Sequence, residues 1–331
     1  MRMQFSLHSP NGGVKEVARI RERVVHAEEL GFEGVYLGCS QLSTLDPFQV
    51  LATCAVATTR LKLGTGVTNM VYQEPTVLVG SAATLNEISD GRAVLGLGTG
   101  DGPVYALGRK ATRMKDFEEG IRTIRNLLQG GEMVTPTGRV RVTYRLLPAP
   151  VYLAVEGPRG LRLAGRAADG VFVASGVEPR AVGWARARIA EGAAEAGRSP
   201  DEITTLAAGM VCIKEDGDEA RQLVRRRIAN RVHHNFQATM ETVPEEELES
   251  VKKFMAAFDQ SKPMEERSDP ALLTDYLVRR FAIAGTPKEC IARLEELADA
   301  GVERVMLTPA RAVYEETVEA LAREVMPEFR G

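Results

Sequence analysis

Residues 61–69 read LKLGTGVTN and residues 93–102 read AVLGLGTGDG, and these two stretches decide the fold. Each begins as a short apolar run, which is typical of a buried strand, and ends in glycines and small polar residues. A predicted helix follows each of them, at residues 75–91 and at about residues 117–128. A buried strand, a glycine-rich break and a helix together make one βα unit.

The same order of apolar run, break and amphipathic stretch recurs along the whole chain. Eight strands are predicted, at residues 3–8, 34–38, 61–68, 93–98, 151–155, 170–174, 203–213 and 305–307. The predicted helices lie at residues 14–30, from 46 onward, 75–91, about 117–128, 158–168, 179–196, 286–301 and 311–325. Eight such units fit an α/β fold, the (β/α)8 TIM barrel, in which all strands end at the face that carries the active site. A doubly wound open sheet is the alternative.

Two stretches interrupt this rhythm. Residues 130–150 are interpreted as a loop or hairpin excursion, and residues 215–280 as a helical insertion. We therefore predict one barrel domain over residues 1–331, with two additions that shape the substrate pocket.

Composition excludes several classes of function. The chain has 42 Lys and Arg against 45 Asp and Glu, a net charge of −3, which argues against a nucleic-acid partner. No apolar run is long enough for a signal peptide or a membrane span. The four cysteines lack metal-site spacing and suit a reducing compartment. We expect a cytoplasmic protein without a metal site or a membrane partner.

The glycine string at residues 96–102 does not fit the dinucleotide motif G-x-G-x-x-G in any register, and no Walker A, HExxH, GxSxG or EF-hand pattern occurs. Glycines at strand ends expose backbone N–H groups, so a flat ring or a phosphate can approach the main chain closely. The alternative is that the glycines within residues 63–67 only relieve crowding inside a barrel.

Five segments carry a resemblance to a known family. They are LGTGVTN at 63–69, DGR leading into LGLGTGD at 90–101, AVEGP at 154–158, ADGV at 168–171 and AGTP at 284–287. In this order they resemble the luciferase-like superfamily of flavin and deazaflavin oxidoreductases, and most closely its methylenetetrahydromethanopterin reductase-like branch. The resemblance extends from about residue 14 to about residue 309.

This resemblance implies a luciferase-like TIM barrel with insertions and a redox cofactor at the C-terminal face, either coenzyme F420, a deazaflavin, or FMN. It also implies a non-proline cis peptide at Gly66-Val67, pressed against the cofactor ring. Thr68 and Asn69 would flank the ring, and its other side would be lined by Gly98, Thr99 and Gly100.

Two further segments are expected to hold the cofactor phosphate. Glu156-Gly157-Pro158 and Ser175-Gly176 are each predicted to head a helix, whose first N–H groups attract an anion. Plain helix capping would produce the same pattern.

The chain departs from the family at the residues that carry acid chemistry. Many relatives have Asp-His after the second strand, where this chain has Cys39-Ser40, and Arg-His-Pro after the third, where it has Gln73-Glu74-Pro75. The remaining candidates for catalysis are His8, Cys39, Glu74 and Asp101. His8 is either a proton shuttle or an ordinary strand-end residue, and Asp101 either acts in catalysis or bonds its own loop.

The insertion contains RRR at 225–227 and HH at 233–234. Adjacent histidines on a helix point to different sides, so we do not expect a metal pair. The arginines are interpreted as a solvated face or as a contact for an anionic cofactor tail.

The resemblance implies an F420-dependent oxidoreductase that transfers a hydride between the reduced deazaflavin and a small organic substrate. The alternatives are a two-component FMN-dependent monooxygenase, a catalytically silent cofactor-binding protein, and a barrel lyase or isomerase that acts on a phosphorylated substrate. A flavin or F420 reductase is a candidate partner. Relatives commonly dimerise beside the second and third strands, and the small residues at 80–83 fit close packing there, so a homodimer is predicted.

Overall fold

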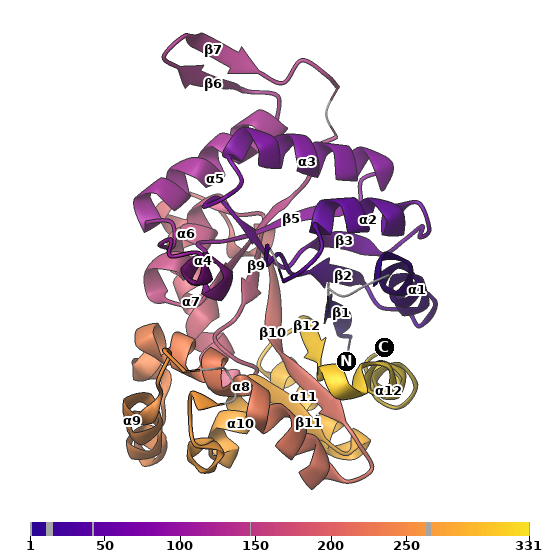
Figure 1. Ribbon diagram of the computed structural model, residues 1–331, viewed down its shortest axis with the longest axis vertical. Helices are drawn as coiled ribbons and strands as arrows, with labels where there is room; N and C mark the ends of the chain where they lie inside the picture. The colour runs from indigo at the N-terminus through magenta and orange to yellow at the C-terminus, as the bar shows by residue number, and fades with distance from the viewer. Residues whose placement is uncertain (1, 11–15, 42, 146, 263–265, 331) are drawn as a thin grey trace.

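The computed structural model describes residues 2–10, 16–41, 43–145, 147–262 and 266–330. Eight parallel strands close into a barrel (Figure 1). They are β1 (Gln4–Ser9), β2 (Gly34–Leu37), β3 (Lys62–Thr65), β5 (Ala93–Gly98), β8 (Val151–Val155), β9 (Gly170–Val173), β10 (Thr204–Ile213) and β12 (Arg304–Pro309). β12 is the last strand of the barrel, and it pairs both with β10 and with the first strand, β1, so the sheet is closed. The predicted barrel is therefore confirmed, and the doubly wound open sheet is wrong.

Helices surround this barrel where the sequence pattern predicts them. They are α1 (Glu16–Glu29), α2 (Pro47–Ala55), α3 (Pro75–Ile88), α5 (Met114–Leu128), α6 (Pro158–Ala167), α7 (Pro179–Glu195), α11 (Pro287–Asp299) and α12 (Tyr314–Ala320). Residues 14 and 15, where the first helix was expected to begin, lie outside the described residues. The carboxylate of Asp46 caps α2 by accepting from the Gln49 N–H, and Thr286 and Glu289 form a capping box on α11. No described helix combines the length and the apolarity that a membrane span requires.

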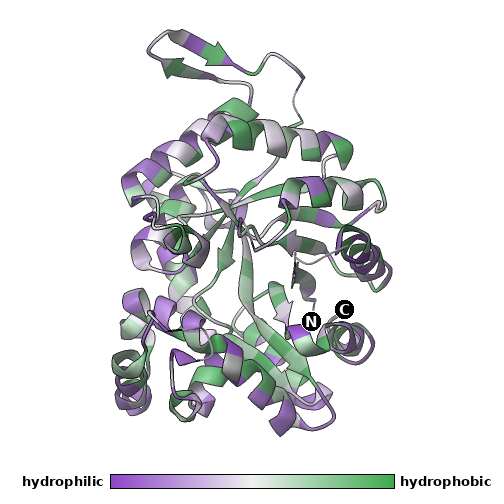
Figure 2. Cartoon of the chain, viewed as in Figure 1, coloured by the Kyte–Doolittle hydropathy of each residue, from purple (hydrophilic) through white to green (hydrophobic). Residues whose placement is uncertain are grey.

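The interior of the barrel is filled with side chains. Apolar residues predominate on the strands, whereas polar residues lie mainly on the helices (Figure 2). The ring of Phe172 contacts Tyr36 and Tyr152 edge to face, with ring centres 4.8 and 5.6 Å apart. Met306 belongs to the same buried cluster. A barrel packed in this way leaves room for a ligand only above the cluster, at one end of the strands.

The third strand contains a bulge. β3 pairs Gly64 with Val94 of β5, and the short strand β4 (Thr68–Asn69) resumes with Thr68 opposite Leu97. Between these two pairs the chain moves on by four residues in the β3–β4 segment but by only three in β5, so the β3–β4 segment contains one extra residue. The Gly66-Val67 peptide bond in this bulge is cis, as the family resemblance implied.

The stretch between α5 and β8 forms a separate antiparallel hairpin of β6 (Glu132–Thr135) and β7 (Gly138–Arg141). The hairpin projects beyond α3 and α5 (Figure 1). Its residues are exposed or half-buried, and of its strands only Met133 of β6 packs against the main apolar core.

The stretch between β10 and α11 is helical and has its own apolar cluster. It contains α8 (Gly217–Thr239), α9 (Leu248–Ala257) and α10 (Asp275–Phe281), with 3-10 turns between them. A strand that was not predicted, β11 (Ala282–Gly285), follows α10 and pairs with the last four residues of β10. β10 is thus longer than the barrel needs, and its end anchors the insertion.

Candidate active site

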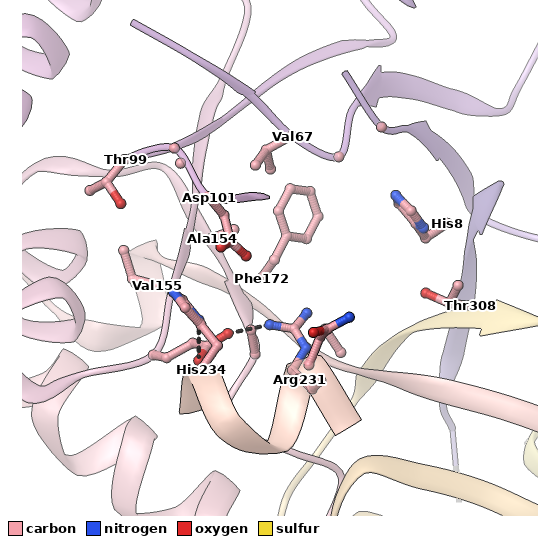
Figure 3. Close-up of a pocket in the computed structure, with 18 of the residues that line it drawn as sticks. His8, Val67, Thr99, Asp101, Ala154, Val155, Phe172, Arg231, His234 and Thr308 are labelled. Atoms are coloured by element: carbon pink, nitrogen blue, oxygen red, sulfur yellow. Dashed lines mark hydrogen bonds and ion pairs between the residues drawn. The ribbon is translucent and has the colours of Figure 1, made fainter. Parts of the chain in front are cut away.

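A cavity of about 1210 Å³ lies at the carboxyl ends of the barrel strands (Figure 3). Its floor includes Phe172 and Met306 from the barrel interior. The structure brings most of the predicted site residues together around this cavity: His8, Cys39, Gly66, Val67, Thr68, Asn69, Gly98, Thr99, Gly100, Asp101, Glu156, Gly157 and Pro158. A cavity of this size is large enough for a tricyclic ring and a second small molecule.

One wall of the cavity is made by the bulge after β3. The side chains of Thr68 and Asn69 are buried and engaged within their own loop. The Thr68 Oγ1 donates to the Gln73 Oε1 over 2.6 Å, and the Asn69 Oδ1 accepts from the Val71 N–H over 3.0 Å. These bonds fix the loop, so the surface offered to a ligand is mainly backbone and the side chain of Val67.

The neighbouring wall, at the end of β5, is open at two glycines, Gly98 and Gly100, which alternate with Thr99 and Asp101. A Cβ atom added to Gly98 would lie 3.0 Å from the Val67 Cγ2, and Gly100 has a φ of 104°, which favours glycine. Because a side chain at position 98 would occupy the space in front of Val67, the two glycines keep open a site where a flat ring could lie against the main chain.

His8 is held neutral at the end of β1. Burial lowers the pKa of His8 to about 4, although the Gly66 carbonyl accepts a hydrogen bond from its ring and opposes the shift. An imidazole with this pKa is neutral at pH 7, so it can accept a proton but has no cationic proton to donate.

The other two candidates for catalysis in the cavity differ in exposure. Burial raises the pKa of the Cys39 thiol, which therefore stays protonated at neutral pH. Asp101 is exposed and precedes the short helix α4 (Gly102–Ala106), and its carboxylate makes no capping bond to that helix.

Three predicted residues lie away from the cavity lining. Glu74 caps α3, where its Oε2 accepts from the Thr76 N–H over 2.9 Å. Ser175 is fully buried and donates to the Glu156 carbonyl, and a Cβ on Gly176 would lie 2.5 Å from the Arg280 carbonyl oxygen. The expectation that Ser175-Gly176 heads a helix is wrong, because α7 begins at Pro179. Of the two helix N-termini considered for phosphate, the one that borders the cavity is that of α6.

Glu156 is the centre of a charged network between β8 and α8. Its carboxylate pairs with Arg231 and meets the His234 Nδ1 at 3.2 Å (Figure 3). It also accepts from the Asn235 Nδ2 over 3.1 Å. Burial disfavours the charged carboxylate, but these partners outweigh it and lower the pKa of Glu156. The hydrogen bond to Glu156 raises the pKa of His234.

One face of α8 forms the wall opposite the glycines; of its residues, the sequence had suggested only Arg227, as one of the two readings of the arginines at 225–227. Its residues recur at helical spacing: Arg227, Asn230, Arg231, His234, Gln237 and Ala238. Arg159 and Arg311 also line the cavity. The guanidinium groups of Arg159, Arg227 and Arg311 form no hydrogen bond or ion pair with another residue that the structure describes. In a chain of net charge −3, this concentration of arginine favours an anionic ligand.

Comparison with known proteins identifies the family to which this chain belongs. A family model described as luciferase-like monooxygenase matches residues 3–304. The chain belongs to this family. Among the similar proteins, 5,10-methylenetetrahydromethanopterin reductase of Methanolobus tindarius is 29% identical over 321 residues, covering 94% of this chain and 96% of the relative. An F420-dependent glucose-6-phosphate dehydrogenase of Nakamurella multipartita is 25% identical over 356 residues, covering 100% of this chain and 97% of the relative.

A solved structure agrees with the fold described above. The coenzyme F420-dependent tetrahydromethanopterin reductase of Methanopyrus kandleri superposes with a TM-score of 0.77 at 26% identity, and the match covers all of both chains. The match therefore includes the insertion as well as the barrel.

Proposed function

We propose that this protein is an F420-dependent oxidoreductase that transfers a hydride between the deazaflavin and a small organic substrate. The observation that carries the proposal is the pairing of two unlike walls in one cavity. One wall, at Gly66, Gly98 and Gly100, is mainly backbone, and the rest of the lining includes Arg159, Arg227 and Arg311, whose guanidinium groups have no ionic partner among the described residues. The similarity to relatives named for F420 over nearly the whole chain supports the same conclusion.

The residues present fit this cofactor. A Cβ on Gly98 would fill the cradle in which a flat ring could lie, since it would be 3.0 Å from the cavity-lining Val67 Cγ2. The phosphate and the carboxylates of the F420 tail suit the α6 N-terminus at Gly157 together with Arg159 and Arg227. FMN carries a single phosphate, so the number of cations favours F420.

When bound, F420 supplies hydride transfer at carbon 5 of its ring. The chain contributes position and environment. The cluster around Phe172 closes the floor to water, and the loop bonds of Thr68 and Asn69 hold the wall beside the ring rigid. The rest of the cavity, towards α8, is the proposed place for the substrate.

Parallel titrations of the purified protein with F420 and with FMN, followed by fluorescence at fixed salt, test the proposal. F420 should bind more tightly, and its affinity should fall as salt increases because the arginine contacts are screened. A preference for FMN would overturn the proposal in favour of an FMN-dependent monooxygenase with a separate reductase. Binding of neither would favour a protein without a redox ring.

We propose further that the chain acts in the cytoplasm as a homodimer of single barrel domains. The four cysteines are free thiols, which suits a reducing compartment. Val77 and Ile88 on α3 are exposed apolar residues, which supports a contact through that helix. Light scattering at micromolar concentration should give about twice the chain mass of 36.0 kDa, and a single-chain mass would contradict the dimer.

A further inference from the structure

Glu156 and His234 form a carboxylate–imidazole pair inside the cavity. Both residues line it, and they come from different elements, Glu156 from the end of β8 and His234 from α8. The Glu156 side chain is 10% exposed and the His234 side chain 43% exposed. The carboxylate is therefore the buried partner, and the imidazole is the one that a bound molecule can reach.

The hydrogen bond fixes how the imidazole can act. Because the His234 Nδ1 faces a carboxylate, Nδ1 carries a proton and donates it to the Glu156 Oε2. Nε2 has no hydrogen-bond partner among the residues that the structure describes, so it is the ring nitrogen available to a ligand. A carboxylate that orients an imidazole in this way is the arrangement found in many proton-transfer sites.

The surrounding charges favour a protonated imidazole. Glu156 and Asp101 face His234 from the ends of β8 and β5 and raise its pKa, while Arg231 and burial oppose them. The other candidates are poorer proton donors at neutral pH, because His8 is held neutral and burial raises the pKa of the Cys39 thiol.

We propose that His234, oriented by Glu156, donates the proton that a substrate needs when it is reduced in this cavity. This inference rests on the function proposed above. His234 is then the catalytic acid, and Glu156 is a positioning residue.

The step balances for a substrate whose carbon is bonded to a nitrogen or an oxygen that can take up an electron pair. The carbon would gain a hydride from reduced F420, which provides both electrons and releases a proton to solvent as it becomes oxidised. In a substrate with a polar double bond the π electron pair moves to the heteroatom, and in a methylene group held between two nitrogens one carbon–nitrogen bond breaks and leaves its electron pair on the departing nitrogen. The Nε2–H bond of His234 breaks as the new N–H or O–H bond forms on that atom, and the neutral imidazole takes up a proton from solvent.

The pair can be tested without cofactor or substrate. The chain has four histidines, so their ring signals can be followed by NMR as pH changes, and His234 can be assigned by its loss in His234→Gln. We expect His234 to titrate above its ordinary pKa in the wild type and at lower pH in Glu156→Gln. An unchanged titration in Glu156→Gln would overturn the pairing.

The role in catalysis needs a kinetic test, for which His233→Gln is the matched control. His233 is adjacent on α8, but its ring stacks on Phe258, with ring centres 4.1 Å apart, and is not part of the cavity lining.

The probe reaction is a single turnover of reduced F420 with 5,10-methylenetetrahydromethanopterin, followed by stopped flow. His234→Gln should slow hydride transfer roughly 100-fold and remove the loss of rate at high pH, whereas F420 affinity should stay within about threefold.

Equal rates in His234→Gln and His233→Gln would overturn the catalytic role. In Glu156→Gln the loss of rate should shift to lower pH, an effect that a purely structural role of Glu156 would not produce. Failure of the wild type to bind F420 would count against the proposed function alone. If the wild type does not use the probe substrate, the NMR titration decides the pairing.

Discussion

Thr65 and Gly96 exchange two hydrogen bonds across the bulged part of the barrel. The Thr65 Oγ1 donates to the Gly96 carbonyl over 2.8 Å and accepts from the Gly96 N–H over 2.9 Å. At this point the backbones of β3 and β5 are out of register, so the side chain of Thr65 serves both backbone groups that would otherwise have no partner.

We predict that Thr65→Val destabilises the protein by about 2–4 kcal/mol, because it keeps the shape of the side chain but leaves two buried backbone groups without partners. Thr65→Ser keeps the hydroxyl, so its loss of stability should be much smaller. Urea unfolding at neutral pH measures both variants. Equal losses in the two variants would show that the methyl group matters rather than the hydrogen bonds.

Gly98→Ala should weaken F420 binding roughly tenfold or more, which corresponds to about 1.4 kcal/mol. The added methyl group would lie 3.0 Å from the Val67 Cγ2 and narrow the space for the ring. Gly102→Ala is the control, because its Cβ would meet nothing within 4 Å. Fluorescence titration compares the two, and an unchanged F420 affinity in Gly98→Ala would contradict a ring site at this wall.

The low pKa of His8 predicts a loss of stability in acid. Below its ordinary pKa of 6.5, His8 binds a proton in the unfolded chain, whereas in the folded protein it stays neutral until about pH 4. The free energy of unfolding should therefore fall by about 2–3 kcal/mol between pH 7 and pH 4 through this residue. The fall in His8→Gln should be smaller by that amount, as measured by urea unfolding at several pH values.

His26 provides a control of opposite sign for that experiment. A hydrogen bond to Glu319 raises the pKa of His26, so its contribution to stability is present in acid and is lost as pH rises. His26→Gln should therefore not reduce the acid sensitivity of the protein. If it did so as strongly as His8→Gln, the effect could not be assigned to burial of His8.

Arg280 connects the insertion to the barrel from a fully buried position. Its Nη2 donates to the Thr242 Oγ1 over 2.6 Å, and its Nη1 lies 3.4 Å from the Glu178 Oε2. Arg280→Met should cost about 2–4 kcal/mol, because it leaves Glu178 without its ion partner. Amide hydrogen exchange should become faster in α8 and α10 than in the barrel strands.

Arg279→Met is the matched control for this variant. Arg279 is half exposed and pairs with Glu296 at the surface, so its replacement should cost less than about 1 kcal/mol. Similar losses of stability in the two variants would mean that the ion pair of Arg280 does not fix the insertion to the barrel.

The barrel strands were predictable because each is a buried apolar run followed by glycine or a small polar residue. β11 was not, since its four residues, AIAG, directly follow α10 and look like a last helical turn. The strand forms only because β10 continues past the barrel and offers an edge. Glu74 could have been identified as a cap, because Glu74-Pro75 repeats the pattern of Asp46-Pro47.

The candidate site likewise contains residues that could be predicted from the sequence and residues that could not. Residues at strand ends, such as Gly98 and Asp101, converge because the topology of a barrel places all strand ends at one face. The α8 residues Arg231 and His234 were not predicted to be in the site, because which face of a helix meets a cavity depends on how the helix docks. No local pattern encodes that docking.

The contrast between the two cavity walls has a consequence for how such proteins diversify. The glycine wall is made of backbone at the end of the barrel, where a Cβ on Gly66 would lie 2.8 Å from the Tyr36 Cβ and one on Gly98 would lie 3.0 Å from the Val67 Cγ2, so even a small side chain crowds a neighbouring segment. The α8 wall is made of side chains on a helix outside the barrel strands, so Gln237 or Ala238 can be exchanged without disturbing any strand. Natural selection can thus alter the preferred substrate along one helix while the inherited cofactor chemistry remains intact.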